Sequence, residues 1–247
     1  MFDTTPKERA YLAPFFAFFL PPALSGLINL FFEGQAHWMV AHPEYWIHPA
    51  QLLLCGTLLA HYWHFYEWRR PHGVLFALFI GILALVIWVV PQLLFQEFPH
   101  FASGIAPLDK ALHSWAAPRT KGFDPAFFGA EGWPYFANLT VRFLRLVIIV
   151  PLVEEIFWRG FLLRYLVRND FLQVPVGTFE RNSCLLVALF FMLEHQPPDY
   201  PAALVTGFLF NAVAYRTGSL SACVLTHAVT NLLLGIYVLQ SGQLGFW

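Results

Sequence analysis

The sequence predicts an all-α polytopic membrane protein with about seven to eight transmembrane helices and a polar site in the core of the bundle. Hydrophobic residues make up 58% of the 247 residues and charged residues only 12%, whereas soluble domains carry about 25% charged residues. Several apolar runs approach the roughly 20 residues that a helix needs to cross a bilayer. The net charge of -1, without a basic stripe, excludes nucleic acid as a partner.

Seven apolar segments are expected to cross the membrane. The first is kinked at Pro21-Pro22; it is longer than a signal-peptide core and no clear small-residue cleavage site follows it, so it is expected to stay in the protein. After the third, Pro, Gly and charged residues predict a long loop, with a short amphipathic piece at 107–117 that lies at the membrane interface. The predicted spans are residues 11–32, 47–66, 74–95, 138–168, 183–195, 200–215 and 220–239.

These spans are expected to form one integral membrane domain in two parts. Residues 1–137 hold the first three spans and the long loop. Residues 138–247 form a four-helix core that carries the polar site.

Three charged residues interrupt the fourth span. Glu154, Glu155 and Arg159 stand inside a run that is otherwise typical of a membrane helix. Each charge near a bilayer centre costs roughly 2.5–3.5 kcal/mol on insertion scales, so the three together cost about 8–10 kcal/mol before any pairing. Such a cost indicates that the charges find partners or water and serve a function. The structural alternative is a salt bridge that only fastens two helices.

Helical geometry separates the two carboxylates. Glu155 and Arg159 are four residues apart, so they lie one above the other and are expected to pair. Glu154 is turned about 100° from Glu155 and has no arginine one turn away. Pro151 is expected to kink the helix and to free a backbone carbonyl one turn before Glu154. The pattern predicts one buried ion pair for structure and one carboxylate left for chemistry.

Three more polar groups within spans are candidates to meet Glu154, namely His195, His227 and Asn231. Counted along the helices, Glu154 and His195 come out at roughly 21–23 Å from the same membrane face, and Asn231 at roughly 20 Å. His227 and Asn231 are four residues apart and share a helix face. The agreement in depth predicts one shared site, although each group alone also fits an interhelical hydrogen bond.

Other polar residues are interpreted as structural. Glu194, at the end of the fifth span, is interpreted as interfacial, and Asn211 as a helix-packing residue. An aromatic-rich helix end is typical of an interfacial belt, with a metal or haem ligand set as the alternative; it carries His61, His64 and Glu67.

Three motifs stand in order along the chain, each within a predicted span: Glu154-Glu155-x-x-x-Arg159, Phe191-x-x-x-His195 and His227-x-x-x-Asn231. Together they resemble the motif set of the CAAX-protease and bacteriocin-processing (CPBP/ABI) family of intramembrane glutamate endopeptidases, over about residues 138–240. The stretch 154–160 also resembles the CAAX-protease-related proteins of bacterial exosortase systems.

The resemblance implies an endopeptidase embedded in a bacterial inner (cytoplasmic) membrane, with a protein or peptide substrate that is prenylated or membrane-anchored near its C-terminus. It implies direct attack by water, with no acyl-enzyme, no cofactor and no metal. The implied roles are general base for Glu154, water-holding partner for His195, oxyanion stabilisation for His227 and Asn231, and orientation of the site for Glu155 and Arg159.

Other functions compete with this interpretation. Two histidines and a glutamate fit a zinc-dependent intramembrane metalloprotease, although the chain has no His-Glu-x-x-His motif. Cys223 and His227, four residues apart, fit a thiol–imidazole dyad. From a different class, the charges fit a non-enzymatic membrane scaffold, an immunity-type protein or a carrier with an ion path.

Overall fold

The computed structural model describes residues 5–32, 37–69, 72–97, 104–116 and 121–247, and every regular element within these ranges is helical. Parts of the predicted loop at 96–135 lie outside the described residues. The α-helices are α1 (Pro6–Phe18), α2 (Leu20–Phe31), α3 (Trp38–Ala41), α4 (Glu44–Tyr62), α5 (Val74–Glu97), α6 (Ala106–Ala116), α7 (Gly132–Leu144), α8 (Val150–Glu155), α9 (Leu163–Tyr165), α10 (Arg181–Leu193), α11 (Tyr200–Thr217) and α12 (Leu220–Ser241). Two π-helical segments, η2 (Arg145–Ile149) and η3 (Ile156–Leu162), join α7 to α8 and α8 to α9. Short 3₁₀ turns are η1 (Trp63–Phe65), η4 (Phe171–Gln173), η5 (Pro197–Asp199) and η6 (Leu244–Phe246).

Each of the seven predicted spans is helical, but the predicted count of seven to eight crossings is not confirmed. Four helical stretches in the described part of the chain are long and apolar enough to cross a membrane: Pro6–Phe31, Val74–Leu94, Gly132–Tyr165 and Leu220–Ser241. Helix α10 has only 13 residues. Helices α4 and α11 reach 19 and 18 residues, but the polar residues within them lower their mean hydropathy. The predicted interfacial piece at 107–117 corresponds to α6.

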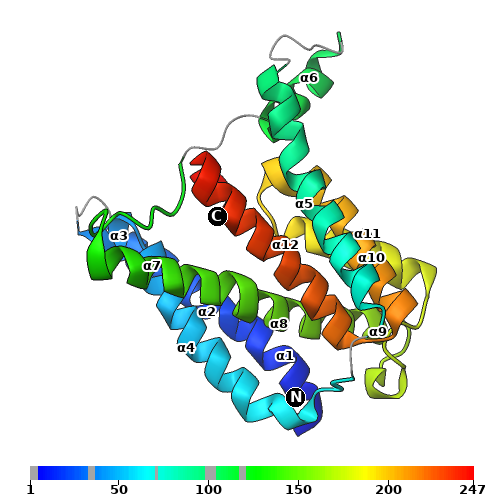
Figure 1. Cartoon of the computed structure of the whole chain (residues 1–247). Coiled ribbons are helices and arrows are strands. Elements are labelled where there is room, and N and C mark those ends of the chain that lie inside the picture. Colours follow the sequence, from blue (N-terminus) through cyan, green and yellow to red (C-terminus); the bar gives the residue numbers. More distant parts are fainter. Residues whose placement is uncertain (1–4, 33–36, 70–71, 98–103, 117–120) are drawn as a thin grey trace.

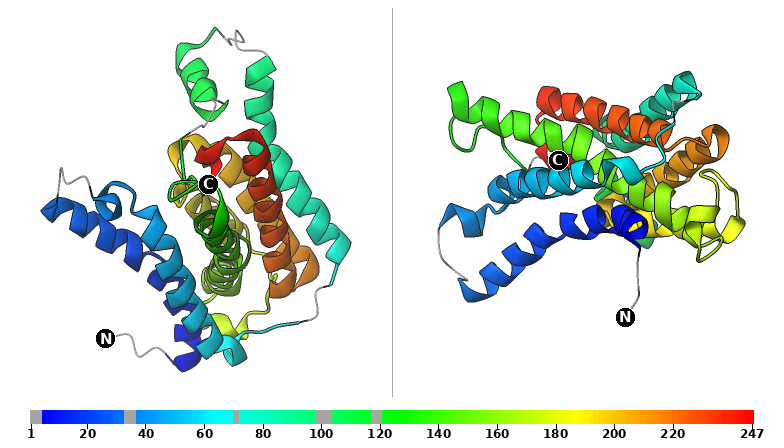
Figure 2. Two further views of the ribbon diagram at one scale, coloured as in Figure 1. Left: turned by 60° about the vertical axis from the view of Figure 1, so that its left-hand side comes forward. Right: turned by 90° about the horizontal axis from the view of Figure 1, so that it is seen from below.

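A single long path from α7 to α9 runs through the middle of the molecule (Figure 1). Helices α1, α2 and α4 lie on one side of it, and α5, α10, α11 and α12 lie on the other, an arrangement that the views in Figure 2 also show. Helix α12 packs along α5 and also contacts η2 and α8. The central path therefore presents its charged residues to both groups of helices.

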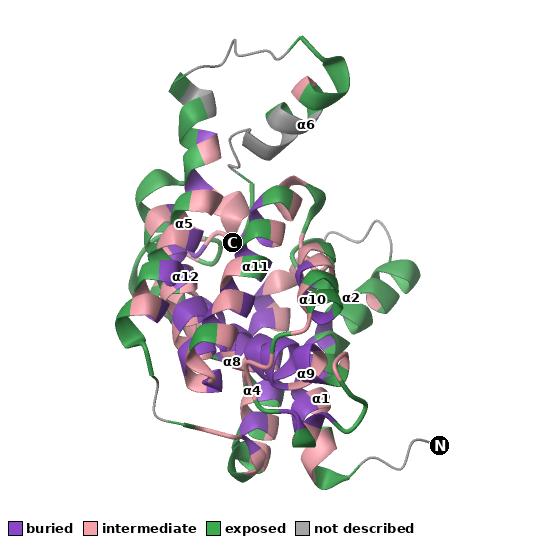
Figure 3. Ribbon diagram, turned by 90° about the vertical axis from the view of Figure 1, so that its right-hand side faces the viewer, coloured by how far each residue is buried: buried purple, intermediate pink, exposed green. Residues whose placement is uncertain are grey.

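Charged residues lie within the core, and large apolar side chains cover much of the outer surface. Glu155 and Arg159 are fully buried, whereas Leu75 and Phe31 are 83% and 81% exposed. Figure 3 shows the buried residues gathered around α8, α9 and α1, with exposed residues along the outer faces. Extensive exposed apolar surface marks contact with lipid or with another protein, and together with the apolar helices it fits a protein embedded in a bilayer.

The predicted break in the first apolar run is confirmed. Helix α1 ends at Phe18 and α2 begins at Leu20, so that Pro21 and Pro22 fall in the first turn of α2. A proline is tolerated there because the first N–H groups of a helix have no partner within the helix. The two helices thus bend where the dipeptide begins.

Helix α1 packs closely against the π-helical segment η3. The rings of Phe15 and Phe157 stack with 3.7 Å between their centroids. The Tyr11 ring lies against Gly160, where an added Cβ would come within 2.9 Å of Tyr11 Cε1. This contact joins the two parts of the chain that the sequence separates at residues 137 and 138, and that division stays a prediction.

We expect Gly160→Ala to lower the free energy of unfolding by about 1–3 kcal/mol, because a methyl group would overpack the contact with Tyr11. The measurement is the unfolding midpoint of the purified protein in detergent micelles. Gly26→Ala is the matched control, since an added Cβ there has no atom within 4 Å, and its midpoint should stay unchanged or rise. Equal midpoints for the two variants would show that the contact with Tyr11 has room for an added methyl group.

Candidate active site

A fully buried ion pair forms the base of the site. Arg159 Nη1 donates to Glu155 Oε1 at 3.0 Å, which confirms the pairing that the four-residue spacing predicts. The same guanidinium donates from Nε to Asn211 Oδ1 and from Nη2 to the Gly207 carbonyl, both at 3.1 Å. It also lies over the rings of Phe191 and Phe210. Asn211 is therefore a partner of the ion pair, in addition to packing α11 against α10.

Helix α12 joins this ion pair through its histidine. His227 Nδ1 lies 2.9 Å from Glu155 Oε1, so one carboxylate oxygen accepts from both the imidazole and the guanidinium. A buried charge without a partner costs several kcal/mol. The cluster of Glu155, Arg159 and His227 thus ties η3 and α11 to α12 and fixes where the imidazole faces.

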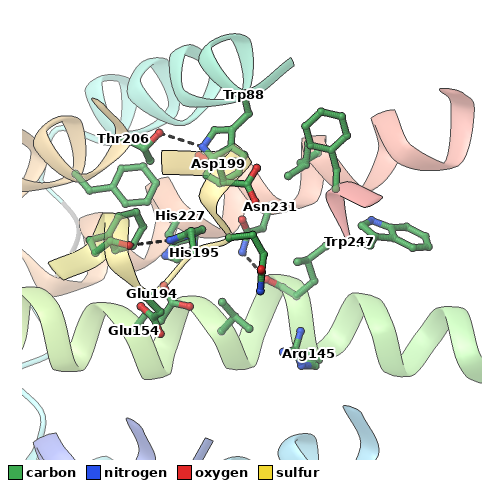
Figure 4. Close-up of a pocket in the computed structure, with 18 of the residues that line it drawn as sticks. Trp88, Arg145, Glu154, Glu194, His195, Asp199, Thr206, His227, Asn231 and Trp247 are labelled. Atoms are coloured by element: carbon green, nitrogen blue, oxygen red, sulfur yellow. Dashed lines mark hydrogen bonds between the residues drawn. The ribbon is translucent and has the colours of Figure 1, made fainter. Parts of the chain in front are cut away.

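Glu154 points away from this cluster into a cavity of about 320 Å³. Its side chain is buried, and Oε2 has no hydrogen-bond partner among the described residues. Figure 4 shows the carboxylate on the central helix with His195, His227 and Asn231 above it. All four predicted catalytic residues line this cavity, as the similar depths along three helices predict.

His195 follows the end of α10 and is held in one orientation. Its Nδ1 lies 2.8 Å from the Phe191 carbonyl, which only accepts hydrogen bonds, so Nδ1 carries the proton. The neutral ring then keeps a lone pair on Nε2. The ring packs against Phe191 and Trp88, with centroid distances of 4.8 and 5.4 Å. No hydrogen bond joins His195 to Glu154 in the described part of the chain, although both line the same cavity.

Asn231 is positioned by a backbone carbonyl of the central helix. In η2 the Val150 N–H bonds to the Arg145 carbonyl, five residues back. In the same register Pro151 would donate to Leu146, but proline has no N–H. Asn231 Nδ2 donates to this freed Leu146 carbonyl at 2.9 Å. Pro151 thus frees a backbone carbonyl, as expected. In the register of the π-helical turn this carbonyl belongs to Leu146, five residues before Pro151.

Glu194 also lines the cavity and is not simply interfacial, as the sequence interpretation has it. Its Oε2 accepts a hydrogen bond from Trp158 Nε1 at 3.1 Å. The signal available in the sequence was its position next to His195, together with Trp158 four residues after Glu154.

Two arginines, Arg142 and Arg145, line the same cavity and were not among the predicted site residues. They precede the charged motif on the central helix. Counting 100° per residue along an uninterrupted α-helix does not place either arginine on the side of Glu154. The π-helical turn η2, which lies between Arg142 and Glu154, changes the angle between them.

The competing arrangements find less support in the geometry. The described residues contain no group of three or more His, Cys, Asp or Glu side chains arranged to hold a metal ion. Cys223 is fully buried, and His227 Nδ1 bonds to Glu155. The geometry therefore gives less support to a thiol–imidazole dyad. His61 and His64 are exposed, as in an interfacial belt, while Glu67 accepts from Arg164 at 3.4 Å.

We expect Arg159→Ala to destabilise the protein by about 3–5 kcal/mol, because it leaves the Glu155 carboxylate buried without its main counter-charge. Unfolding of the purified protein in detergent measures this loss. Arg168→Ala removes an exposed arginine of the same stretch and should shift stability by less than about 0.5 kcal/mol. Similar losses in both variants would contradict a structural role for the ion pair.

The part of the chain that carries the three motifs is similar to a known protein family. Residues 136–233 match the family model described as type II CAAX prenyl endopeptidase Rce1-like. The matched segment contains all three motifs, from Glu154 to Asn231. No curated protein and no solved structure matches the chain. The family indicates a CAAX-type intramembrane protease, and with the apolar helices it indicates an integral membrane protein. Residues 136–233, which are less than half of the chain, are therefore similar to the Rce1-like type II CAAX prenyl endopeptidases.

Proposed function

We propose that this protein is an intramembrane endopeptidase in which Glu154 and His195 activate a water molecule to hydrolyse a peptide bond. The observation that carries the proposal is the buried Glu154 carboxylate, which lines a cavity together with His195, His227 and Asn231 and whose Oε2 has no partner among the described residues. A polar group left in this state is expensive. A bound water satisfies it and is at the same time the reactant.

Glu154 acts as the general base in this mechanism. Its carboxylate takes a proton from the water as the oxygen attacks the carbonyl carbon of the substrate. The Nε2 lone pair of His195 accepts the second hydrogen of that water, since Nδ1 is occupied by the Phe191 carbonyl. The proton then passes from Glu154 to the leaving amine. Positioned acid–base groups of this kind contribute about 10²–10⁴-fold to the rate.

His227 and Asn231 stabilise the oxyanion that forms on the substrate. One N–H of the Asn231 amide is used by the Leu146 carbonyl, and the second is available to the oxyanion. Because Nδ1 of His227 is engaged by the Glu155 carboxylate, Nε2 is the ring nitrogen that is left to face the oxyanion. A single donor of this kind is worth roughly 10²–10³-fold in kcat. Glu155 and Arg159 act by positioning His227.

The substrate class follows from the family. We infer a protein or peptide whose prenylated or otherwise membrane-anchored C-terminal segment reaches the cavity from the bilayer. A bacterial inner membrane and an exosortase-related subgroup are consistent with the residues at 154–160, and both belong to this proposal.

We expect Glu154→Gln to lower kcat by at least about 10²-fold, because the amide keeps the shape of the side chain but cannot take the proton. The assay follows cleavage of a peptide with an S-farnesyl cysteine and three further residues at its C-terminus, using purified protein in liposomes and mass spectrometry of the products.

Glu131→Gln is the control for this change, because Glu131 is exposed and lies outside the cavity; its activity should equal that of the unaltered protein. If Glu154→Gln cleaves at the normal rate, the base assignment is wrong. Absence of cleavage by the unaltered protein, on this peptide and on its membrane proteome, would favour the scaffold alternative. Loss of activity on chelation would favour zinc.

We expect Cys223→Ala to keep at least about half of the kcat, because the thiol is fully buried in the core and direct attack by water needs no nucleophilic side chain. The same liposome assay measures it. A loss comparable to that of Glu154→Gln would revive the thiol–imidazole dyad.

A further inference from the structure

The two arginines of the cavity lack the carboxylate partners that other buried arginines have. Arg159 pairs with Glu155 at 3.0 Å and Arg164 with Glu67 at 3.4 Å. By contrast, Arg142 and Arg145 form no ion pair with an Asp or Glu among the described residues. Both belong to the stretch that leads into the charged motif, and both line the cavity that holds Glu154.

Neutral groups and aromatic rings hold these two guanidiniums in place. Arg142 is 4% exposed; its Nη1 lies 3.1 Å from His48 Nε2, and its Nε is buried without a partner. Arg145 Nε donates to Gln51 Oε1 at 2.6 Å, and its guanidinium lies 4.9 Å from the centre of the Phe18 ring. A preorganised pair of cations, one buried and one half-buried, with unused donors fits an incoming anion.

The π-helical turn brings Arg142 to the same side of the helix as Glu154. In an uninterrupted α-helix Arg142 and Glu154 would be about 120° apart around the axis. The extra residue taken up by η2 reduces this angle to roughly 20°. Figure 4 shows Arg145 and Glu154 along one helix below the cavity, with Trp247 near the arginine end. Acidic side chains line the part of the cavity around His195, namely Glu154, Glu194 and Asp199.

The separation of the two ends corresponds to a short peptide. Glu154 is nine residues from Arg145 and twelve from Arg142 along the helix, which is roughly 13–18 Å at 1.5 Å per residue. An extended peptide covers about 3.3–3.6 Å per residue. An anion held by the arginines would therefore lie roughly four to five residues from a peptide bond at Glu154.

We propose that Arg142 and Arg145 bind the free α-carboxylate at the C-terminus of the substrate and so fix how many residues are released. The proposal rests on the proposed function, because it assumes that a peptide is cut at Glu154. The planar guanidinium donors match a carboxylate in two-point geometry, which a C-terminal amide does not reproduce.

The test compares two farnesylated peptides of one sequence, one with a free C-terminal carboxylate and one with a C-terminal amide. In phosphatidylcholine liposomes we expect the unaltered protein to cleave the carboxylate form with a kcat/KM about 10- to 100-fold higher. Arg142→Gln and Arg145→Gln should each reduce this ratio to about threefold or less, and Arg145→Lys should restore part of it. Arg168→Gln, at an exposed position, should keep the full ratio.

Several outcomes overturn the proposal while leaving the proteolytic function intact. One is equal cleavage of the two peptides, and another is a preference for the carboxylate that neither arginine variant alters. The third outcome concerns the lipid. Phosphatidylglycerol replaces phosphatidylcholine in the liposomes, and kcat/KM is measured again. If the arginine variants alter only the effect of this lipid on kcat/KM, the arginines bind a lipid headgroup. Unfolding midpoints identify a variant that fails to fold, and the half-buried Arg145 then carries the test alone.

A binding measurement separates this proposal from the function on which it rests. Fluorescence anisotropy of both peptides is measured on the inert Glu154→Gln protein. If the unaltered protein cleaves neither peptide, the proteolytic assignment fails for this substrate class. Tighter binding of the carboxylate peptide, lost on further replacement of Arg145 by glutamine, would still support the anion site. Equal binding of the two peptides would end the proposal.

Discussion

Burial of charge in an apolar bundle is the constraint on which the rest of the structure depends. Glu155 and Arg159 are fully buried, and an ion in such surroundings is tolerated only when close partners offset the cost of its burial. One carboxylate oxygen serves both Arg159 and His227, and the remaining guanidinium donors reach α11. The same contacts that neutralise the charges fix η3, α11 and α12 against one another. The position of His227 relative to Glu154 is thus a consequence of satisfying the buried ion pair.

Departures from regular α-helix in the central path decide which side chains face the cavity. The π-helical turn η2 precedes Pro151, and η3 follows Glu155. π-helical turns often occur at functional sites, since they leave backbone groups unpaired and rotate the faces that follow. Here the turn leaves the Leu146 carbonyl for Asn231. It also brings residues before and after Pro151 to one side of the helix, so a single helix supplies both an acidic and a basic end of one cavity.

The surroundings of this cavity suit hydrolysis inside a lipid layer. Large apolar side chains cover the outside of the bundle, while carboxylates, imidazoles, guanidiniums and amides gather within it. A polar cavity of about 320 Å³ can hold water where the bilayer cannot. The fixed dipoles and charges around it are already oriented, and such preorganised groups stabilise a transition state more effectively than solvent does.

The sequence by itself determined the helices and the local pairing. Apolar runs of sufficient length predict helices at all seven places, Pro21-Pro22 predicts the break between α1 and α2, and the four-residue spacing predicts the Glu155–Arg159 pair. The segment 136–233 that matches the family model contains all three motifs, which are read directly along the chain. Only the tertiary structure decided that His227 bonds to Glu155, that Asn231 bonds to Leu146, that Glu194 lines the cavity and that two arginines share it. These contacts join residues far apart in sequence or depend on the phase shift at η2, and the periodicity of one helix carries no information about how its neighbours pack or where a π-helical turn forms.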